Sequence, residues 1–338
     1  MRDIDDHATI DTSSTDSLPT NETLASESNF SVSYPFKYIA VLTGIVGVVT
    51  NGVVLAALLS KDRIKKTINL FIINQVALDL FSSAFLSVTY AIKLSSPQFV
   101  GTLGYFLCSV FDSDMITFVG LTGSLVSLVL MAAERYFLIV FPIFHKTQVK
   151  HWLIITLGTL PWIEGVVANV PVFWTSAVVD GVSLKFYFWP SEAAQLAYSI
   201  CIILLTFFLP LALLVFFYGS VLIVVRRRSQ VFLEHYANQD MSTVLQTNAH
   251  RAQMNIISTM IIVSVAFAVC WFPSQIWYLF LIVQYNVPNN DTFYSVSLFL
   301  IFLNISLNPF IYATKLDPVK KKLRGWASRS KSTVDTVA

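Results

Sequence analysis

The sequence predicts an all-α membrane protein in which seven transmembrane helices form a bundle and a short amphipathic eighth helix follows. Three observations lead to this fold class. The 338 residues are 55% hydrophobic and only 12% charged, and their mean hydropathy of +0.66 exceeds that of ordinary soluble domains. Seven long apolar stretches alternate with polar loops, and basic residues concentrate in every second loop. The formal charge of +2 does not indicate a nucleic-acid partner.

Residues 1–36 form a region of their own before the first apolar stretch. They are rich in Ser, Thr, Asp and Glu and contain no apolar run, which predicts a disordered extracellular tail. Asn21 and Asn29 each begin an Asn-x-Ser/Thr triplet, the acceptor of N-glycosylation. Because no cleavable signal sequence is visible, the first span is expected to act as the export signal.

The membrane domain is predicted to run from 37 to 314. Its apolar stretches can each cross a hydrocarbon core of ~30 Å, and none has the charged outward face that a soluble bundle needs. In the cytoplasmic tail, 315–338, the basic segment from Asp317 to Trp326 is predicted to lie on the inner leaflet as an amphipathic helix. The predicted spans are 37–60, 67–93, 104–140, 152–174, 193–225, 253–285 and 292–314.

The distribution of Lys and Arg predicts the orientation of the chain. Of the 22 basic residues, only Arg2, Lys37, Lys93 and Lys185 fall on the same side of the membrane as the amino terminus. Because basic loops stay in the cytoplasm, the amino terminus is expected outside and the carboxyl terminus inside. The protein is thus predicted to be a multi-pass protein of the plasma membrane.

The third span ends in the charged triplet Glu134-Arg135-Tyr136. Ionisable residues at the edge of lipid are expensive and usually functional. From Cys108 to Arg135 we expect one continuous helix of about 40 Å, at ~1.5 Å per residue, which is longer than the ~30 Å core. Such a helix would connect an outer pocket to an inner surface.

The other spans contain polar and kink-forming residues. Asn51 and Asp79 are placed in mid-membrane, where a carboxylate has to change its protonation or find a cation. Pro210 of the fifth span leaves the carbonyl of Thr206 without an amide donor, which predicts a bulge or kink. The sixth span contains Phe267 and Cys270-Trp271-Phe272-Pro273, and the seventh ends Asn304-Ile305-Ser306-Leu307-Asn308-Pro309-Phe310-Ile311-Tyr312.

These motifs, in this order and in these spans, resemble the rhodopsin-like (class A) G protein-coupled receptors over residues 37 to about 326. The stretch from Cys270 to Leu279 is similar to invertebrate neuropeptide-type receptors. The resemblance implies a receptor, not an enzyme, that binds an extracellular ligand and activates heterotrimeric G proteins when the sixth helix moves outward. It implies that coupling depends on Glu134, Arg135, Tyr136, Tyr218, Gln253, Asn308, Pro309 and Tyr312, and the packing switch on Pro210, Phe267, Trp271 and Pro273.

The resemblance implies one ion site and no other cofactor. Relatives hold a sodium ion at the mid-membrane acid, and the matching positions here are Asp79, Ser124, Asn304 and Asn308. Oxygen ligands suit a small hard cation. The alternative is a neutral cluster of hydrogen-bonded polar groups.

The ligand class is narrowed by two positions. Thr117 stands where amine receptors carry an aspartate, and Phe302 stands where opsins carry the retinal-binding lysine. The outer acids Asp112, Asp180, Glu192 and Asp291 favour a basic peptide, unless they merely solvate loops. A receptor for a lipid or other small non-amine ligand is the alternative. The candidate pocket residues are Asp114, Thr117, Phe118, Leu121, Ser274, Gln275, Tyr278, Phe299 and Phe302, beside Trp271.

Two further features leave questions open. Cys108 lies near the position from which relatives form a disulfide to the second outer loop, but the loop from Trp174 to Glu192 has no cysteine, so we expect that loop to be more mobile. Glu164 in the fourth span is either a functional acid or a protonated one bonded to Asn169 or a neighbouring helix. A transporter is disfavoured because no internal repeat is visible, and an intramembrane enzyme because no histidine lies in a span.

Overall fold

The computed structural model describes residues 32–59, 67–95, 98–179, 181–184, 190–235, 242–282, 291–316, 319–325 and 328. The predicted disordered tail and its glycosylation acceptors Asn21 and Asn29 lie outside these residues. All described residues belong to one compact unit that begins at Val32. Within it, seven helices are long and apolar enough to cross a membrane, which confirms the predicted fold class.

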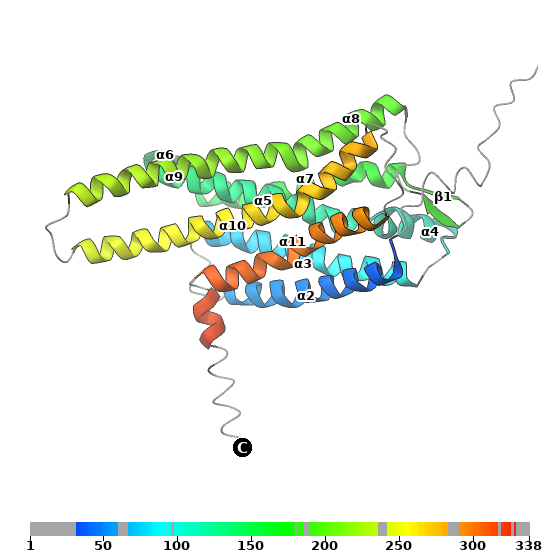
Figure 1. Cartoon of the computed structure of the whole chain (residues 1–338), viewed down its shortest axis with the longest axis horizontal. Coiled ribbons are helices and arrows are strands. Elements are labelled where there is room, and N and C mark those ends of the chain that lie inside the picture. The colour runs from blue at the N-terminus through cyan, green and yellow to red at the C-terminus, as the bar shows by residue number, and fades with distance from the viewer. Residues whose placement is uncertain are drawn as a thin grey trace, which may run out of the picture. The chain divides into compact units, whose positions relative to one another are not determined.

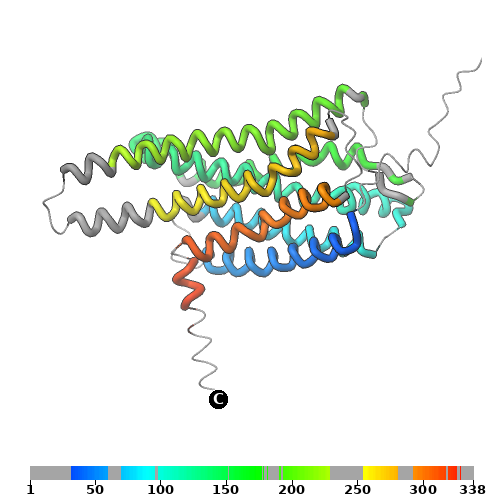
Figure 2. The backbone as a smooth tube through the Cα atoms, in the orientation of Figure 1, coloured from blue at the N-terminus to red at the C-terminus, as the bar shows by residue number. Residues whose placement is uncertain are grey.

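Most helix boundaries lie within a few residues of the predicted spans, but the sixth span begins eleven residues before the predicted 253 and the fifth ends ten residues after the predicted 225. The first and second spans are α2 (Tyr34–Leu58) and α3 (Thr67–Leu94), and the fourth is α7 (His151–Thr175). The sixth and seventh are α10 (Ser242–Ile282) and α11 (Asp291–Lys315), both of which contain the expected proline within the helix. Figures 1 and 2 show these helices running alongside one another.

The third span occupies the centre of the bundle, where it packs against α3, α7, α9 and α10. In the most apolar part of the third span, 67% of the residues are buried, compared with 22% in α7 and 28% in α2. The apolar side chains of α7 and α2 face outward, as expected for helices in contact with lipid. The third span was expected to be one continuous helix, and this expectation is wrong. The chain forms α4 (Gly101–Leu107), a π-helical turn η1 (Cys108–Asp112), a break at Ser113 and Asp114, and then α5 (Met115–Val140).

The fifth span confirms the bulge predicted from Pro210. It consists of α8 (Glu192–Ile203), a π-helical segment η2 (Leu204–Phe208) and α9 (Leu209–His235). A proline two residues beyond η2 cannot donate to the carbonyl of Thr206, so the helix widens by one residue at that turn.

Small residues allow the central helices to approach closely. A Cβ atom at Gly165 of α7 would collide with the backbone carbonyl of Val119 on α5, and one at Gly120 would collide with Ser82 on α3. A Cβ atom at Gly123 would lie 2.5 Å from the carbonyl oxygen of Pro161. Glycine at such contacts is the usual means by which membrane helices pack backbone to backbone.

Two shorter elements flank the bundle. In the loop between α7 and α8, β1 (Ala177–Val179) and β2 (Val182–Leu184) pair antiparallel, and the amide of Phe99 donates to the carbonyl of Gly181 at 3.1 Å. At the other end of the chain, residues 319–325 are helical, with Val319 buried in the core and Lys321 and Arg324 exposed. This segment has the predicted amphipathic character, and Figure 1 shows it turning away from α11.

Candidate functional site

The predicted inner site centres on an ion pair between neighbouring residues of α5. The Nε atom of Arg135 lies 2.6 Å from Oε2 of Glu134, and the two side chains are only 6% and 5% exposed. The guanidinium therefore faces the protein interior, although it lies near the end of a membrane-spanning helix. Tyr136 does not take part in this ion pair. Its ring packs against Phe216 and Phe217 of α9.

A third residue approaches this pair from the helix that follows. His145, in α6 (Pro142–Gln148), places Nε2 3.4 Å from Oε1 of Glu134. The distance permits an ion pair when the imidazole is protonated, but it does not satisfy hydrogen-bond geometry. No sequence pattern predicts this contact, because α6 lies outside the predicted spans and only the packing of the folded chain brings it next to α5.

Two buried tyrosines on other helices complete the inner site. Tyr218 of α9 and Tyr312 of α11 are 5% and 0% exposed, and neither hydroxyl has a hydrogen-bond partner among the described residues. An apolar cluster of Ile139, Val221, Val225 and Ile257 joins α5, α9 and α10 at the same end. Gln253 lies in α10, but its side chain is outside the described residues.

The predicted packing switch lies in the middle of the bundle. The ring of Trp271 lies 5.7 Å from that of Phe267, which in turn lies 6.0 Å from Phe207 in η2. Trp271 is 2% exposed and Phe267 1% exposed. The two irregular helices, α10 with Pro273 and the fifth span with η2, are therefore in contact through aromatic rings.

The polar cluster around Asp79 joins α3, α5 and α11. Ser124 donates to Oδ1 of Asp79 at 2.8 Å, and the Nδ2 atom of Asn308 donates to Oδ2 at 2.9 Å. Gln75, which sequence reasoning did not select, donates to the Ser124 hydroxyl. The side-chain Oδ1 atoms of Asn304 and Asn308 are buried and accept no hydrogen bond from the described residues.

The outer site differs from expectation at Asp114. This acid does not stand alone in a pocket, because its Oδ2 atom lies 2.7 Å from Nζ of Lys93 on α3. The sequence motifs do not indicate Lys93 as the partner of this acid. Below the pair, Thr117 and Leu121 are buried, and Phe118 contacts Phe302 with a ring separation of 6.5 Å.

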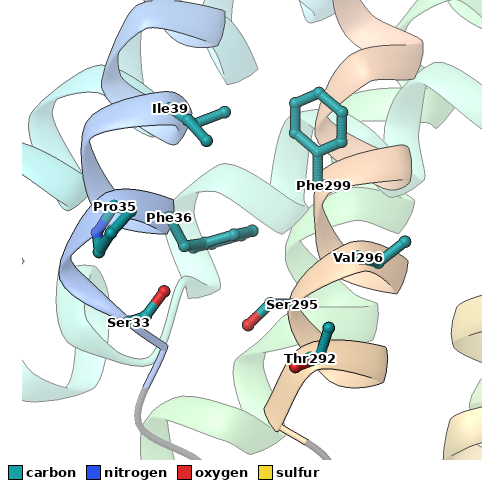
Figure 3. Close-up of a pocket in the computed structure, with 8 residues that line it drawn as sticks. All are labelled: Ser33, Pro35, Phe36, Ile39, Thr292, Ser295, Val296 and Phe299. Atoms are coloured by element: carbon teal, nitrogen blue, oxygen red, sulfur yellow. The ribbon is translucent and has the colours of Figure 1, made fainter.

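The remaining candidate pocket residues are divided between two places. On α10, Ser274, Gln275 and Tyr278 lie in the turns after Trp271, and Gln275 is 8% exposed. Phe299 instead lines a cavity of about 330 Å³ between the outer ends of α2 and α11 (Figure 3). The other residues of this cavity, none of them predicted, are Ser33, Pro35, Phe36, Ile39, Thr292, Ser295 and Val296.

Glu164 does not form the hydrogen bond to Asn169 that was one of its alternatives. The amide of Asn169 donates instead to Thr122, at 3.1 Å, and to the carbonyl of Gly165, at 2.8 Å. The Oε2 atom of Glu164 is buried and has no hydrogen-bond partner among the described residues.

None of the three cysteines forms a disulfide, and all three lie in described helices. Replacing Cys108 by serine is therefore expected to leave surface expression largely intact. Serine keeps the size of the buried side chain and breaks no cross-link. Surface labelling of the variant beside Cys201→Ser, an exposed position, tests this. Retention of only the Cys108 variant inside the cell would contradict it.

The fold and this arrangement define a class, the seven-helix membrane receptors, and comparison with known sequences identifies the family. The model of the family described as 7 transmembrane receptor (rhodopsin family) matches residues 50–312. The chain therefore belongs to this receptor family, whose members are not enzymes, and the resemblance seen in the motifs is confirmed.

The matches to individual relatives have low sequence identity but cover most of this chain. The chain is 25% identical over 276 residues to the substance-K receptor of Bos taurus, a match that covers 79% of this chain and 68% of that protein. It is 24% identical over 289 residues to the tachykinin-like peptides receptor 99D of Drosophila melanogaster, covering 80% and 52%. The crystal structure of squid rhodopsin has a TM-score of 0.69 at 19% identity, covering 86% of this chain and 83% of that one, which shows the shared fold.

Proposed function

We propose that this protein is a plasma-membrane receptor that binds an extracellular peptide and activates heterotrimeric G proteins. Its amino terminus is outside the cell and its carboxyl terminus is in the cytoplasm. The observation that carries the proposal is the buried pair of Glu134 and Arg135, which lies at the end of the bundle where the basic loops are. The peptide assignment is supported by the names of two similar proteins, the substance-K receptor and the tachykinin-like peptides receptor.

The mechanism follows from two alternative partners for one guanidinium. At rest, Arg135 is paired with Glu134 and fills the inner end of the bundle. When the inner end of α10 swings outward, Arg135 turns toward the hydroxyls of Tyr218 and Tyr312 and opens a groove for a helix of the G protein α subunit. A ligand shifts the equilibrium toward this signalling state only by as much as its affinity for the signalling state exceeds its affinity for the resting state.

The proposal is tested by nucleotide exchange in membranes from transfected cells. We expect purified G protein to exchange nucleotide faster in receptor membranes than in vector membranes, and faster still with a member of an amidated peptide panel. A panel of lipids tests the second candidate, favoured by the largely apolar cavity between α2 and α11 (Figure 3). Activation by lipids alone would replace the peptide assignment, and no exchange under any condition would contradict G protein coupling.

A sodium ion fits the cluster around Asp79. One carboxylate, one hydroxyl and the Oδ1 atoms of Asn304 and Asn308, which accept no hydrogen bond from the described residues, are the hard donors that such a cation prefers. The ion would compensate the charge of Asp79 in the resting packing of α3, α5 and α11. Asn51 extends the polar layer by donating to the carbonyl of Ile305 at 3.2 Å.

Replacing Asp79 by asparagine is expected to remove any sodium dependence of thermal stability. In the unaltered receptor, NaCl should raise the unfolding midpoint by several degrees relative to the same concentration of choline chloride, because the ion binds only the folded protein. In Asp79→Asn the two salts should act alike. Equal midpoints for both salts in the unaltered receptor would show that the cluster is a neutral network.

Gln253 occupies the position at which many members of the family carry an acid that pairs with the arginine of the triplet. Without that ion pair the resting state is held more weakly, which predicts signalling without a ligand. Gln253→Glu is expected to lower basal nucleotide exchange by about fivefold, if the added ion pair with Arg135 contributes about 1 kcal/mol to the resting state. The exchange rate per receptor in membranes measures this, with Gln253→Asn as the neutral control. A basal rate that is already near zero and that the glutamate does not lower further would refute it.

A further inference from the structure

Lys93 and Asp114 form a buried ion pair at the outer end of the bundle. Their Nζ and Oδ2 atoms are 2.7 Å apart, and the side chains are 7% and 5% exposed. Lys93 lies in the last turn of α3, and Asp114 directly precedes α5. Burying two charges costs more free energy than burying apolar residues of the same size, so the pair has a cost that packing alone does not explain.

The backbone at Asp114 has an uncommon conformation. The residue has φ 63° and ψ 6°, in the left-handed region that few residues other than glycine adopt, aspartate more readily than most. It occupies the N-cap of α5, where an aspartate normally accepts a hydrogen bond from the first turn, but it makes no such bond. The side chain is directed to Lys93 instead of capping its own helix.

The surroundings of the ammonium are those of a cation site. The Nζ atom of Lys93 lies 4.5 Å from the ring centre of Tyr90, which is itself completely buried between Phe36 and Phe302. The same Nζ atom is 2.7 Å from the Asp114 carboxylate, so one cation contacts both a carboxylate and an aromatic face. This combination binds ammonium and guanidinium groups.

Two buried hydroxyls beside the pair leave hydrogen-bonding capacity unused. Neither the hydroxyl of Tyr90 nor that of Thr117, one turn along α5 from Asp114, has a hydrogen-bond partner among the described residues, and both residues are 0% exposed. Lysine is a compact point charge, whereas a guanidinium presents five donors in a plane. A guanidinium in the place of the lysine could use acceptors that Lys93 leaves unused.

We propose that Asp114 and the face of Tyr90 form a cation-binding subsite, in which Lys93 is the resident cation and a basic side chain of the peptide ligand takes its place. The inference rests on the proposed peptide receptor. Exchange of one cation for another keeps the buried carboxylate compensated throughout, whereas simple removal of Lys93 would leave it unpaired. Lys93 is part of the same chain as Asp114, so it competes with the ligand for the carboxylate at a high effective concentration. A ligand therefore displaces Lys93 only if it also makes other contacts with the receptor.

Chemical rescue in purified receptor tests the subsite without a known ligand. Lys93→Ala is expected to lower the unfolding midpoint by several degrees. Propylguanidinium should restore at least half of this loss, and propylurea, which has a similar shape and no charge, should restore none. The double variant Lys93→Ala/Asp114→Asn should not respond to either compound. Absence of rescue in the single variant, or equal rescue in the double variant, would overturn the proposal.

Two further variants test the subsite if Lys93→Ala does not fold or if an anion is bound instead of a cation. If Lys93→Ala does not fold, Lys93→Met, which retains the side-chain stem, takes its place with methylammonium as the probe and methanol as its neutral control. Asp114→Ala is tested with propionate, and rescue there without cation rescue at Lys93→Ala would make this an anion site and overturn the proposal. None of these readouts requires a G protein, so failure of coupling and failure of the subsite are distinguishable.

Discussion

Arg135→Ala is expected to abolish G protein activation while the receptor still reaches the cell surface. The substitution removes the cation that forms the resting pair and that would bind Tyr218 and Tyr312 in the signalling state. It leaves Glu134 buried, with His145 Nε2 still 3.4 Å from its carboxylate. The change therefore affects the inner end, while the Lys93 pair at the other end of the bundle is untouched. Nucleotide exchange per surface receptor should fall to the level of vector membranes.

Lys146→Ala is the matched control for this variant. Lys146 is an exposed basic residue of α6, so its removal takes one positive charge from the same end without altering the buried pair. We expect its exchange rate to remain close to that of the unaltered receptor. An Arg135→Ala receptor that is expressed and still activates the G protein would show that the pair is structural only.

Gly165→Val is expected to prevent most of the protein from reaching the cell surface. A Cβ atom at this position already overlaps the carbonyl oxygen of Val119, which belongs to the backbone of α5 and cannot rotate away. The larger side chain would force α7 from the most buried helix of the bundle, and overpacking of this kind costs about 1–3 kcal/mol or more. Surface labelling and the thermal midpoint of the purified fraction both measure the effect.

Gly158→Val provides the control within the same helix. A Cβ atom at Gly158 meets nothing within 4 Å, so valine there adds surface without displacing a neighbour. Its expression should match that of the unaltered receptor. If both glycine variants are expressed equally well, the close contact of α5 and α7 is not needed for folding.

The sequence predicts most of the fold because lipid restricts the possible structures. Backbone groups in a membrane must be satisfied within each span, so an apolar stretch of sufficient length indicates a helix with few alternatives. Pro210 predicts the bulge of η2 because the missing amide is a local property of the chain. The motifs at Asp79, Arg135 and Asn308 likewise indicate the polar sites through their chemistry and order.

Other features depend on contacts between distant residues and have no local signal. No proline or glycine marks η1 or the left-handed Asp114, so the third span was expected to be continuous. The pairs of Lys93 with Asp114 and of His145 with Glu134 join side chains on different helices. Their proximity depends on how the helices pack, which the period and composition of each span do not specify.

The outward movement of α10 is the central step of the proposed mechanism, and a distance measurement tests it directly. Spin labels at Leu59, at the inner end of α2, and at Asn255, near the inner end of α10, occupy exposed positions. In a Cys201→Ser background, adding nucleotide-free G protein should lengthen the separation of the labels by several ångströms. The same experiment with Arg135→Ala should leave the separation unchanged. A G protein that binds the receptor without altering the distance would contradict the proposed movement of α10.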